Sequence, residues 1–253
     1  MNQSNNIFAV VSGKGGVGKT WLAITLAQTA AKAGQRVLLM DGDIGLANVD
    51  IQLGIAPTRD LTLWALGKAD LKSLVMPTDA GFDLIPGASG SGAMAGLSGT
   101  EVARLAGDFA GVAADYDLAL IDVAAGADPA QIRLAGAARR CILVITEDPT
   151  SLTDGYAFMK IAQRLRRPPK FEVVVNMAER PGTGANAHTA LARACNSFLK
   201  LDPPLLGVIQ RDTAVVGAIK RQTPLLNAAP GALAAREVAN VLQSLKARPA
   251  RAA

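Results

Sequence analysis

A glycine-rich loop near the start of the chain carries two lysines and a hydroxyl residue, which are groups that bind phosphate. It reads Gly13-Lys14-Gly15-Gly16-Val17-Gly18-Lys19-Thr20. The same glycines satisfy the spacing of a dinucleotide-binding turn, and Asp41 stands about where a ribose-binding acid would lie. A P-loop, however, needs a lysine for the terminal phosphates and a hydroxyl that ligates Mg²⁺, whereas a dinucleotide turn needs neither. Lys19 and Thr20 therefore favour a P-loop.

The segments beside this loop are those that must position it. Residues 7–12 form a short apolar run that is typical of a strand, and residues 21–33 follow the loop with helical spacing until Gly34. A strand, a loop and a helix in this order direct backbone N–H groups and the positive end of the helix toward a polyanion. The segment thus predicts a binding site for a nucleoside triphosphate.

Acidic residues end two further apolar runs. Residues 36–41 lead into Asp41-Gly42-Asp43, and the run 118–121 is followed by Asp122. Carboxylates at the carboxyl ends of strands lie in the crevice where open α/β sheets bind ligands. Asp122 is placed to hold Mg²⁺ through water, as in a Walker B element. The alternative is that Asp41, Asp43 and Asp122 only cap helices or turns.

Length and composition predict a single α/β domain. The chain has 253 residues, of which 50% are hydrophobic and 19% are charged, enough for one substantial core. Strand-like runs alternate with helical patterns, which predicts a mostly parallel, twisted sheet covered by helices on both faces. These runs are residues 7–12, 36–41, 82–86, 117–122, 141–146, 171–177 and 206–210. We expect a short N-terminal extension at 1–6, one nucleotide-binding domain at 7–247 and a basic flexible tail at 248–253; residues 87–99 are the expected mobile loop.

Several classes of site have little support in the sequence. Cys141 and Cys195 have no partner at metal-ligand spacing and are expected to be packed thiols, and His188 is the single histidine. No signal peptide precedes Ile7, and no apolar run approaches the roughly 20 residues that span a bilayer. We therefore expect a cytoplasmic protein.

Three groups of residues resemble a known family. The loop with its additional lysine at position 14, the segment 41–50 and the segment 122–126 are similar to the MinD/ParA group of deviant Walker A ATPases. Segments 41–54, 81–90 and 147–157 are most similar to its FlhG branch, also called FleN or YlxH, whose members regulate flagellar number. The resemblance spans roughly residues 7–245 and implies a slow ATPase that depends on dimerisation, with ATP or ADP and Mg²⁺ as ligands.

The resemblance also implies roles for single residues. Gly13 through Thr20 would cradle the phosphates, with Lys19 on the β- and γ-phosphates, Thr20 on Mg²⁺, and Asp41 and Asp122 completing the metal site. Lys14 would reach the phosphates of the partner in an ATP-bound dimer, as an arginine finger does elsewhere. Asp43 would orient the attacking water. Trp21 would lie near the α-phosphate, while Asn176 and Arg211 would belong to the adenine pocket.

The implied function is a dimeric molecular switch that sets flagellar number or placement. Its partners would be a second copy and flagellar basal-body or regulatory proteins, such as an FlhF-like GTPase or switch-complex proteins. Only residues 1–6 precede the first strand, so the segment that stimulates this GTPase in relatives is expected to be absent. Peripheral attachment at the inner membrane or the cell pole would have to use the last helix, 231–247, whose apolar stripe is typical of a core-facing helix.

Two other functions stay open on the sequence. The net charge of +5 permits an acidic partner, so a ParA-like, DNA-associated positioning ATPase is one alternative. The other is a MinD-like spatial regulator of division or of another envelope machine.

Overall fold

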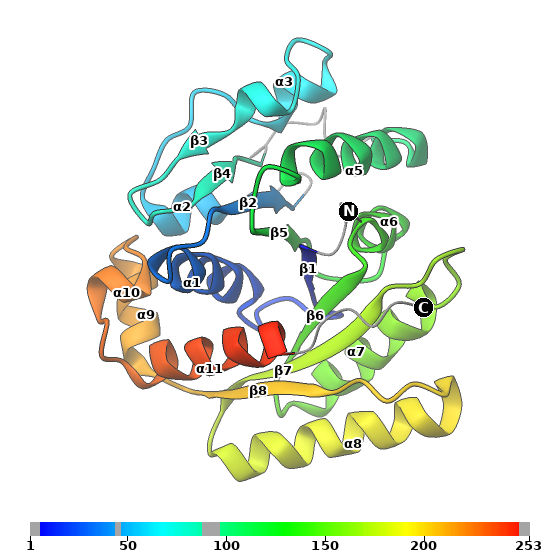
Figure 1. Ribbon diagram of the computed structural model, residues 1–253. Helices are drawn as coiled ribbons and strands as arrows, with labels where there is room; N and C mark the ends of the chain where they lie inside the picture. The colour runs from blue at the N-terminus through cyan, green and yellow to red at the C-terminus, as the bar shows by residue number, and fades with distance from the viewer. Residues whose placement is uncertain (1–5, 44–46, 88–96, 248–253) are drawn as a thin grey trace.

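The computed structural model describes residues 6–43, 47–87 and 97–247. Within these ranges, eight strands form one sheet in the order β3-β4-β2-β5-β1-β6-β7-β8 (Figure 1). The strands are β1 (Ile7–Val11), β2 (Val37–Gly42), β3 (Met76–Pro77), β4 (Asp83–Ile85), β5 (Leu118–Val123), β6 (Arg140–Ile145), β7 (Lys170–Ala178) and β8 (Leu205–Gln210). All pairs are parallel except β3 with β4. The predicted α/β class and the mostly parallel sheet are confirmed.

The central strands are buried on both faces, which explains why their sequences are continuous apolar runs. Every residue of β1, β2, β5 and β6 is buried. The seven predicted strands are all present, with ends within about two residues of those expected. The sequence analysis missed β3, a two-residue edge strand that contains Pro77 and has no period to read.

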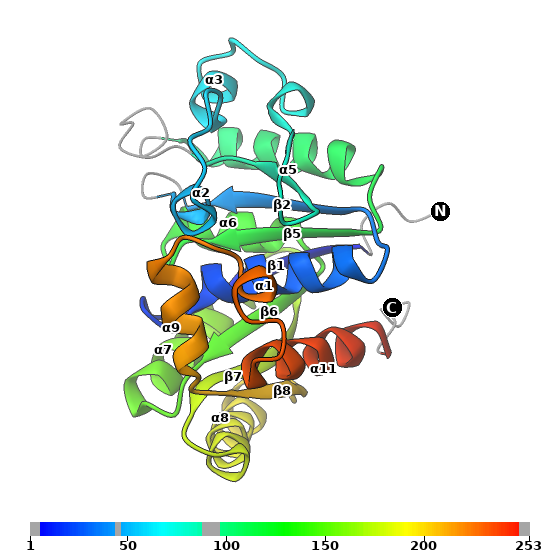
Figure 2. The same cartoon turned by 90° about the vertical axis from the view of Figure 1, so that its left-hand side faces the viewer.

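Helices cover both faces of the sheet, as Figures 1 and 2 show. On one face lie α1 (Lys19–Lys32), α2 (Val49–Leu53), α9 (Thr213–Lys220), α10 (Leu225–Ala228) and α11 (Leu233–Ala247). On the other face lie α3 (Leu61–Ala65), η1 (Lys72–Leu74), α5 (Gly99–Ala113), α6 (Pro129–Ala137), α7 (Pro149–Ala162) and α8 (Pro181–Leu199). The two apolar layers that result hold the strands of the sheet in place.

The last helix lies in the core. Its stripe of Ala234, Val238, Val241, Leu242 and Leu245 is buried, on the same side of the sheet as α1. The core-facing interpretation is therefore confirmed, because these side chains are not exposed to a lipid surface. In the described residues, no helix is long and apolar enough to cross a membrane.

The two thiols are packed as expected. Cys141 lies in β6 and Cys195 in α8, and both are buried free thiols. Burial raises the pKa of each thiol above its ordinary value, to about 11 for Cys195. Among the described residues, no group of histidine, cysteine and acidic side chains has the arrangement of a metal cluster site. Residues 88–96 of the predicted mobile loop and the whole tail at 248–253 lie outside the described residues.

Candidate nucleotide-binding site

The glycine-rich loop connects the end of β1 to the start of α1, at the carboxyl edge of the sheet. Gly16 and Gly18 have φ angles of 78° and 87°, a left-handed conformation that a side chain disfavours. A Cβ atom at Gly13 would overlap the backbone carbonyl of Asp154 in α7. Gly18 is the N-cap of α1 and offers no side chain to the first-turn N–H groups. These donors are therefore left for a ligand, and an anion suits them best.

Two side chains hold the loop in shape. Ser12 Oγ donates to the carbonyl of Lys14 at 2.7 Å. Asn176 Nδ2, at the end of β7, donates to the carbonyl of Val17 at 2.8 Å, across 159 residues of sequence. Asn176 is 2% exposed, so this bond is shielded from water. The sequence placed Asn176 against adenine by resemblance; the structure gives its amide group a contact with the loop.

A hydroxyl and a carboxylate meet where the P-loop joins the sheet. Thr20 Oγ1 donates to Asp122 Oδ2 at 2.6 Å. The other oxygen, Asp122 Oδ1, is buried and has no hydrogen-bond partner. An unpartnered carboxylate oxygen beside a threonine hydroxyl is a suitable donor set for a hard cation such as Mg²⁺, directly or through water. The residues present thus fit the metal ion that a P-loop implies.

Asp41 and Asp122 are neighbours in the register of β2 and β5. Burial raises the pKa of Asp122 to about 7, and the nearby Asp41 carboxylate adds to this effect. Burial also raises the pKa of Asp41 to about 6, although hydrogen bonds from the backbone of Val49, Asp43 and Asn48 oppose it. Asp41 accepts these three bonds at 2.9, 3.1 and 2.9 Å. Its carboxylate therefore holds the backbone N–H groups of Asp43, Asn48 and Val49.

Lys19 is held close to these acids. Its side chain lies at the first position of α1, where the residue is 9% exposed. Burial lowers the pKa of Lys19, while the attraction of Asp122 and Asp43 works in the opposite direction. Because folding has already removed Lys19 from water, its ammonium group can form a strong electrostatic interaction with a polyphosphate that enters the site.

Lys14 has a different environment. Its ammonium group donates to Asp148 Oδ2 at 2.8 Å and to Thr150 Oγ1 at 2.5 Å, both at the start of α7. The Lys14 side chain is 40% exposed. The hydrogen bond from Lys14 and that from the backbone N–H of Thr150 lower the pKa of Asp148 to about 2. The sequence analysis assigned no role to Asp148, although an aspartate before Pro149 is a typical helix N-cap.

The remaining predicted residues border the loop at two places. Arg211 and Met177 line a cleft of about 290 Å³ together with Lys14, Gly15, Gly16 and Val17. Met177 has a φ of 56°, which is unusual for a residue other than glycine, and it lies beside a bulge in β7. Trp21 is 5% exposed and packs in the core layer of α1, with its indole Nε1 unpartnered. Its indole thus lies among apolar side chains.

These features define a P-loop nucleotide-binding domain of the MinD/ParA arrangement, with a lysine at each end of the loop. Residues 8–225 match the family described as "CobQ/CobB/MinD/ParA nucleotide binding domain". The chain belongs to this family, and it is an ATPase of the MinD/ParA type.

Curated relatives place the chain within the family. It is 35% identical to the "Antiactivator FleN" of Pseudomonas aeruginosa over 96% of this chain and 87% of that protein. It is 30% identical to the "Flagellum site-determining protein YlxH" of Helicobacter pylori over 94% of this chain and 81% of that protein. The predicted resemblance to the FlhG branch is confirmed.

Solved structures show the same fold. The cell division ATPase MinD of Pyrococcus furiosus superposes with a TM-score of 0.83 at 22% identity, covering 96% of this chain and 99% of that one. MinD of Pyrococcus horikoshii, which was solved with Mg-ADP, superposes with a TM-score of 0.79 at 23% identity over 94% of each chain.

Proposed function

We propose that this protein is an ATP-driven dimeric switch that regulates the number or placement of flagella. The observation that carries the proposal is the different setting of the two lysines in one P-loop. Lys19 is buried beside Asp122, where it serves the nucleotide of its own chain. Lys14 is 40% exposed at the rim of the cleft, where it is free to serve another chain after its ion pair with Asp148 opens.

The proposal gives each residue of the site a binding role. The N–H groups of the loop and of the first turn of α1 bind the phosphates, and Lys19 adds charge at the terminal ones. Thr20 and Asp122 would hold Mg²⁺, which would supply positive charge to neutralise the phosphates. Asp41 accepts hydrogen bonds from the backbone of Asp43, Asn48 and Val49. Asp43 orients the attacking water.

Dimerisation completes the site. Lys14 of one chain contacts the phosphates bound to the second, so ATP closes the pair and its hydrolysis opens it. Arg211 lines the cleft and would contact adenine, and Asn176 acts by holding the loop. The two states of the switch differ in the surface that they present to flagellar proteins.

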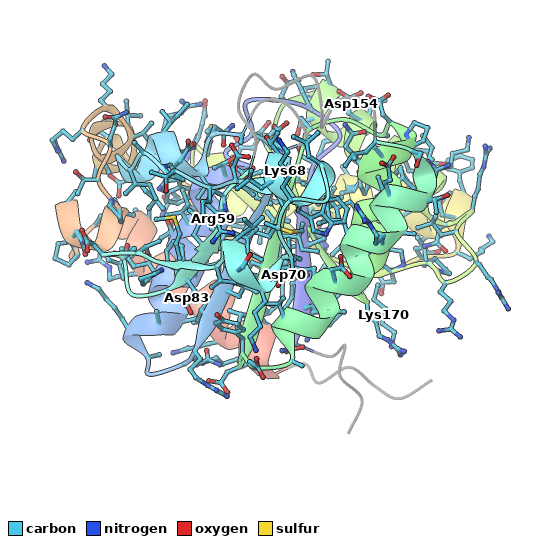
Figure 3. The ribbon with its side chains drawn as sticks, turned by 90° about the horizontal axis from the view of Figure 1, so that it is seen from above. Arg59, Lys68, Asp70, Asp83, Asp154 and Lys170 are labelled. Carbon is cyan, nitrogen blue, oxygen red and sulfur yellow. The ribbon has the colours of Figure 1, made fainter. Side chains whose placement is uncertain are left out.

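Lys14→Ala tests the dimeric mechanism. We expect the variant to bind ATP but to stay monomeric and to lose most of its turnover, because it lacks the cation that acts between chains. Light scattering and phosphate release measure the two properties. The matched control is Lys68→Ala, which removes an exposed lysine on the segment after α3 (Figure 3). A monomeric variant with normal turnover would contradict the mechanism.

Asp43→Ala tests the hydrolytic step separately. Without a group that orients water, ATP should bind and close the dimer, and hydrolysis should fall by about 10²-fold or more. Size-exclusion chromatography in ATP would then show a persistent dimer. Normal phosphate release by this variant would remove Asp43 from its role and leave the binding residues unaffected.

The similarity to FleN and YlxH supports the flagellar role. We expect that deletion of the gene changes the number or position of flagella counted by electron microscopy, and that the Lys14→Ala protein does not restore the pattern. An unchanged pattern would reject this role. Cosedimentation with DNA and with liposomes, each at two salt concentrations, then decides between the two alternative kinds of positioning ATPase.

A further inference from the structure

A polar pocket lies at the amino edge of the sheet, the edge opposite the P-loop. It has a volume of about 330 Å³, and its lining includes residues at the starts of three parallel strands: Gln35, Arg36 and Val37 at β2, Asp83 at β4, and Asp115 and Tyr116 at β5. The P-loop follows β1, which runs parallel to β5, so the pocket and the nucleotide site lie at opposite ends of the strands. Figure 3 shows Asp83 toward one edge of the molecule and Asp154, which lies beside Gly13, toward the other.

Hydrogen bonds between the strand starts fix the walls of the pocket. Asp117 Oδ2 accepts from the backbone N–H of Arg36 at 2.8 Å, and the carbonyl of Arg36 accepts from the N–H of Asp117 at 2.9 Å. Tyr116 Oη donates to Asp83 Oδ2 at 2.7 Å, which joins the start of β5 to that of β4. Burial and the bond to Asp83 raise the pKa of Tyr116, so its hydroxyl stays protonated and remains the donor. The pocket is therefore formed before a ligand binds.

One wall carries an acceptor that lacks a donor. Within the described residues, Gln35 Oε1 is buried and has no hydrogen-bond partner. Most buried polar atoms in proteins are paired, and an unpaired one destabilises the fold unless another group donates to it. The terminal torsion of a glutamine is soft, so a small rotation turns this oxygen toward the pocket that Gln35 lines. An N–H group of a ligand would supply the donor.

The pocket also carries charge of both signs. The side chain of Arg36 is 70% exposed, and its Nε lies 3.8 Å from Asp117 Oδ2, which is too far for a hydrogen bond. Its planar set of N–H donors suits a carboxylate. Asp83 and Asp115 contribute carboxylates at the neighbouring strand starts, and Asp115 pairs with Lys72 at 3.0 Å. A ligand in the pocket would therefore lie between a cation and two anions.

We propose that this pocket binds a basic α-amino acid, with its carboxylate on Arg36 and its cationic side chain on Gln35 and Asp83. The guanidinium of Arg36 pairs with the carboxylate, and the oxygens of Gln35 and Asp83 accept N–H groups of the cation. The volume of the pocket is at the lower end of the range for small-molecule sites, which fits one amino acid. A phosphate-bearing ligand is a poor occupant, because Asp83 and Asp115 repel it, and Arg36 repels a metal ion in the same way.

Isothermal titration calorimetry of the full-length, nucleotide-free protein with L-arginine tests the proposal. We expect saturable binding, and we expect agmatine, which has the guanidinium group but no carboxylate, to bind roughly tenfold more weakly or worse. Gln35→Leu should weaken L-arginine binding by roughly tenfold or more. Its melting temperature without ligand should be unchanged or higher, because a buried unpaired acceptor is removed. The melting temperature thus separates lost binding from lost folding.

The charged residues are tested by two further variants. Arg36→Gln should weaken L-arginine binding by roughly tenfold and leave agmatine binding unchanged, since agmatine has no carboxylate to lose a partner. Asp83→Asn should weaken both ligands, and it keeps an oxygen for the Tyr116 hydroxyl. The matched controls are Arg193→Gln in α8 and Asp202→Asn before β8, because both residues are exposed and β8 lies at the other end of the sheet from β3 and β4. They should leave both affinities unchanged.

Three results would each overturn the proposal: no saturable binding of L-arginine, equal affinity for L-arginine and agmatine, or an unchanged affinity for L-arginine in Gln35→Leu. The pocket shares no lining residue with the cleft at the P-loop. Binding of the amino acid therefore does not depend on the switch proposed above, and either proposal can fail without the other.

Discussion

Asn176→Ala separates two roles for this residue, as an anchor of the P-loop or as a contact for adenine. The amide donates to the carbonyl of Val17 at 2.8 Å, and the residue is 2% exposed. Its removal leaves a buried carbonyl oxygen without a partner, which costs about 1–3 kcal/mol of stability. For a chain of this size, each kcal/mol lowers the melting temperature by about 2–4 °C.

The same change should weaken nucleotide binding without changing base preference. If Asn176 acts by holding Val17, the loop loses its preorganised shape, and ATP and GTP lose the same factor of affinity. A loss of about 1.4 kcal/mol in the organisation of the loop corresponds to a tenfold weaker Kd. Urea unfolding measures the stability, and fluorescent ATP and GTP analogues measure the two affinities.

The control for this prediction is Asn186→Ala, which truncates an exposed asparagine in α8. It should leave both stability and affinity unchanged. The reasoning would be refuted if Asn176→Ala kept its full stability and lost affinity for ATP alone. That result would assign the amide to the base, as the sequence analysis predicted by resemblance.

Two further predictions concern buried charges. Since the pKa values of Asp122 and Asp41 are raised to about 7 and about 6, the folded protein binds more protons than the unfolded chain between about pH 4 and pH 7. The free energy of unfolding of the nucleotide-free protein, measured in urea, should therefore be higher near pH 5 than near pH 8. Asp122→Asn should make this free energy depend less on pH. An unchanged pH dependence in the variant would show that other groups are responsible. Arg140 and Glu172, each side chain 7% exposed, form a bidentate pair with two bonds of 2.8 Å. Arg140→Met should lower the free energy of unfolding by about 3–5 kcal/mol, because it leaves Glu172 unpaired, and adding Glu172→Gln should restore part of this loss. A double-mutant cycle in urea measures the coupling energy of the pair. If the losses of the two single variants simply add, the two side chains are not coupled.

Local pattern was enough to predict the strands and the phosphate-binding loop. The apolar runs that became β1, β2, β5 and β6 are buried on both faces, so their sequences contain an uninterrupted signal. The P-loop could be recognised because its glycines, lysines and hydroxyl group lie within eight consecutive positions of the sequence. Asp122 was found in the same way, as the acid near the end of one such run.

Contacts between distant segments depend on the order of the strands, which no local pattern encodes. Asp148 before Pro149 predicts the start of a helix. The sequence does not predict that Asp148 pairs with Lys14, because the two residues are 134 positions apart. The pair forms because β6 lies next to β1, so that α7 begins beside the loop that follows β1. Asn176 reaches Val17 for the same reason, one strand further along, from the end of β7. Two groups that contact the loop, Asp148 and Asn176, are thus supplied by the two strands that follow β1 in the sheet, and the Asn176 substitution should weaken ATP binding without removing a contact to the nucleotide.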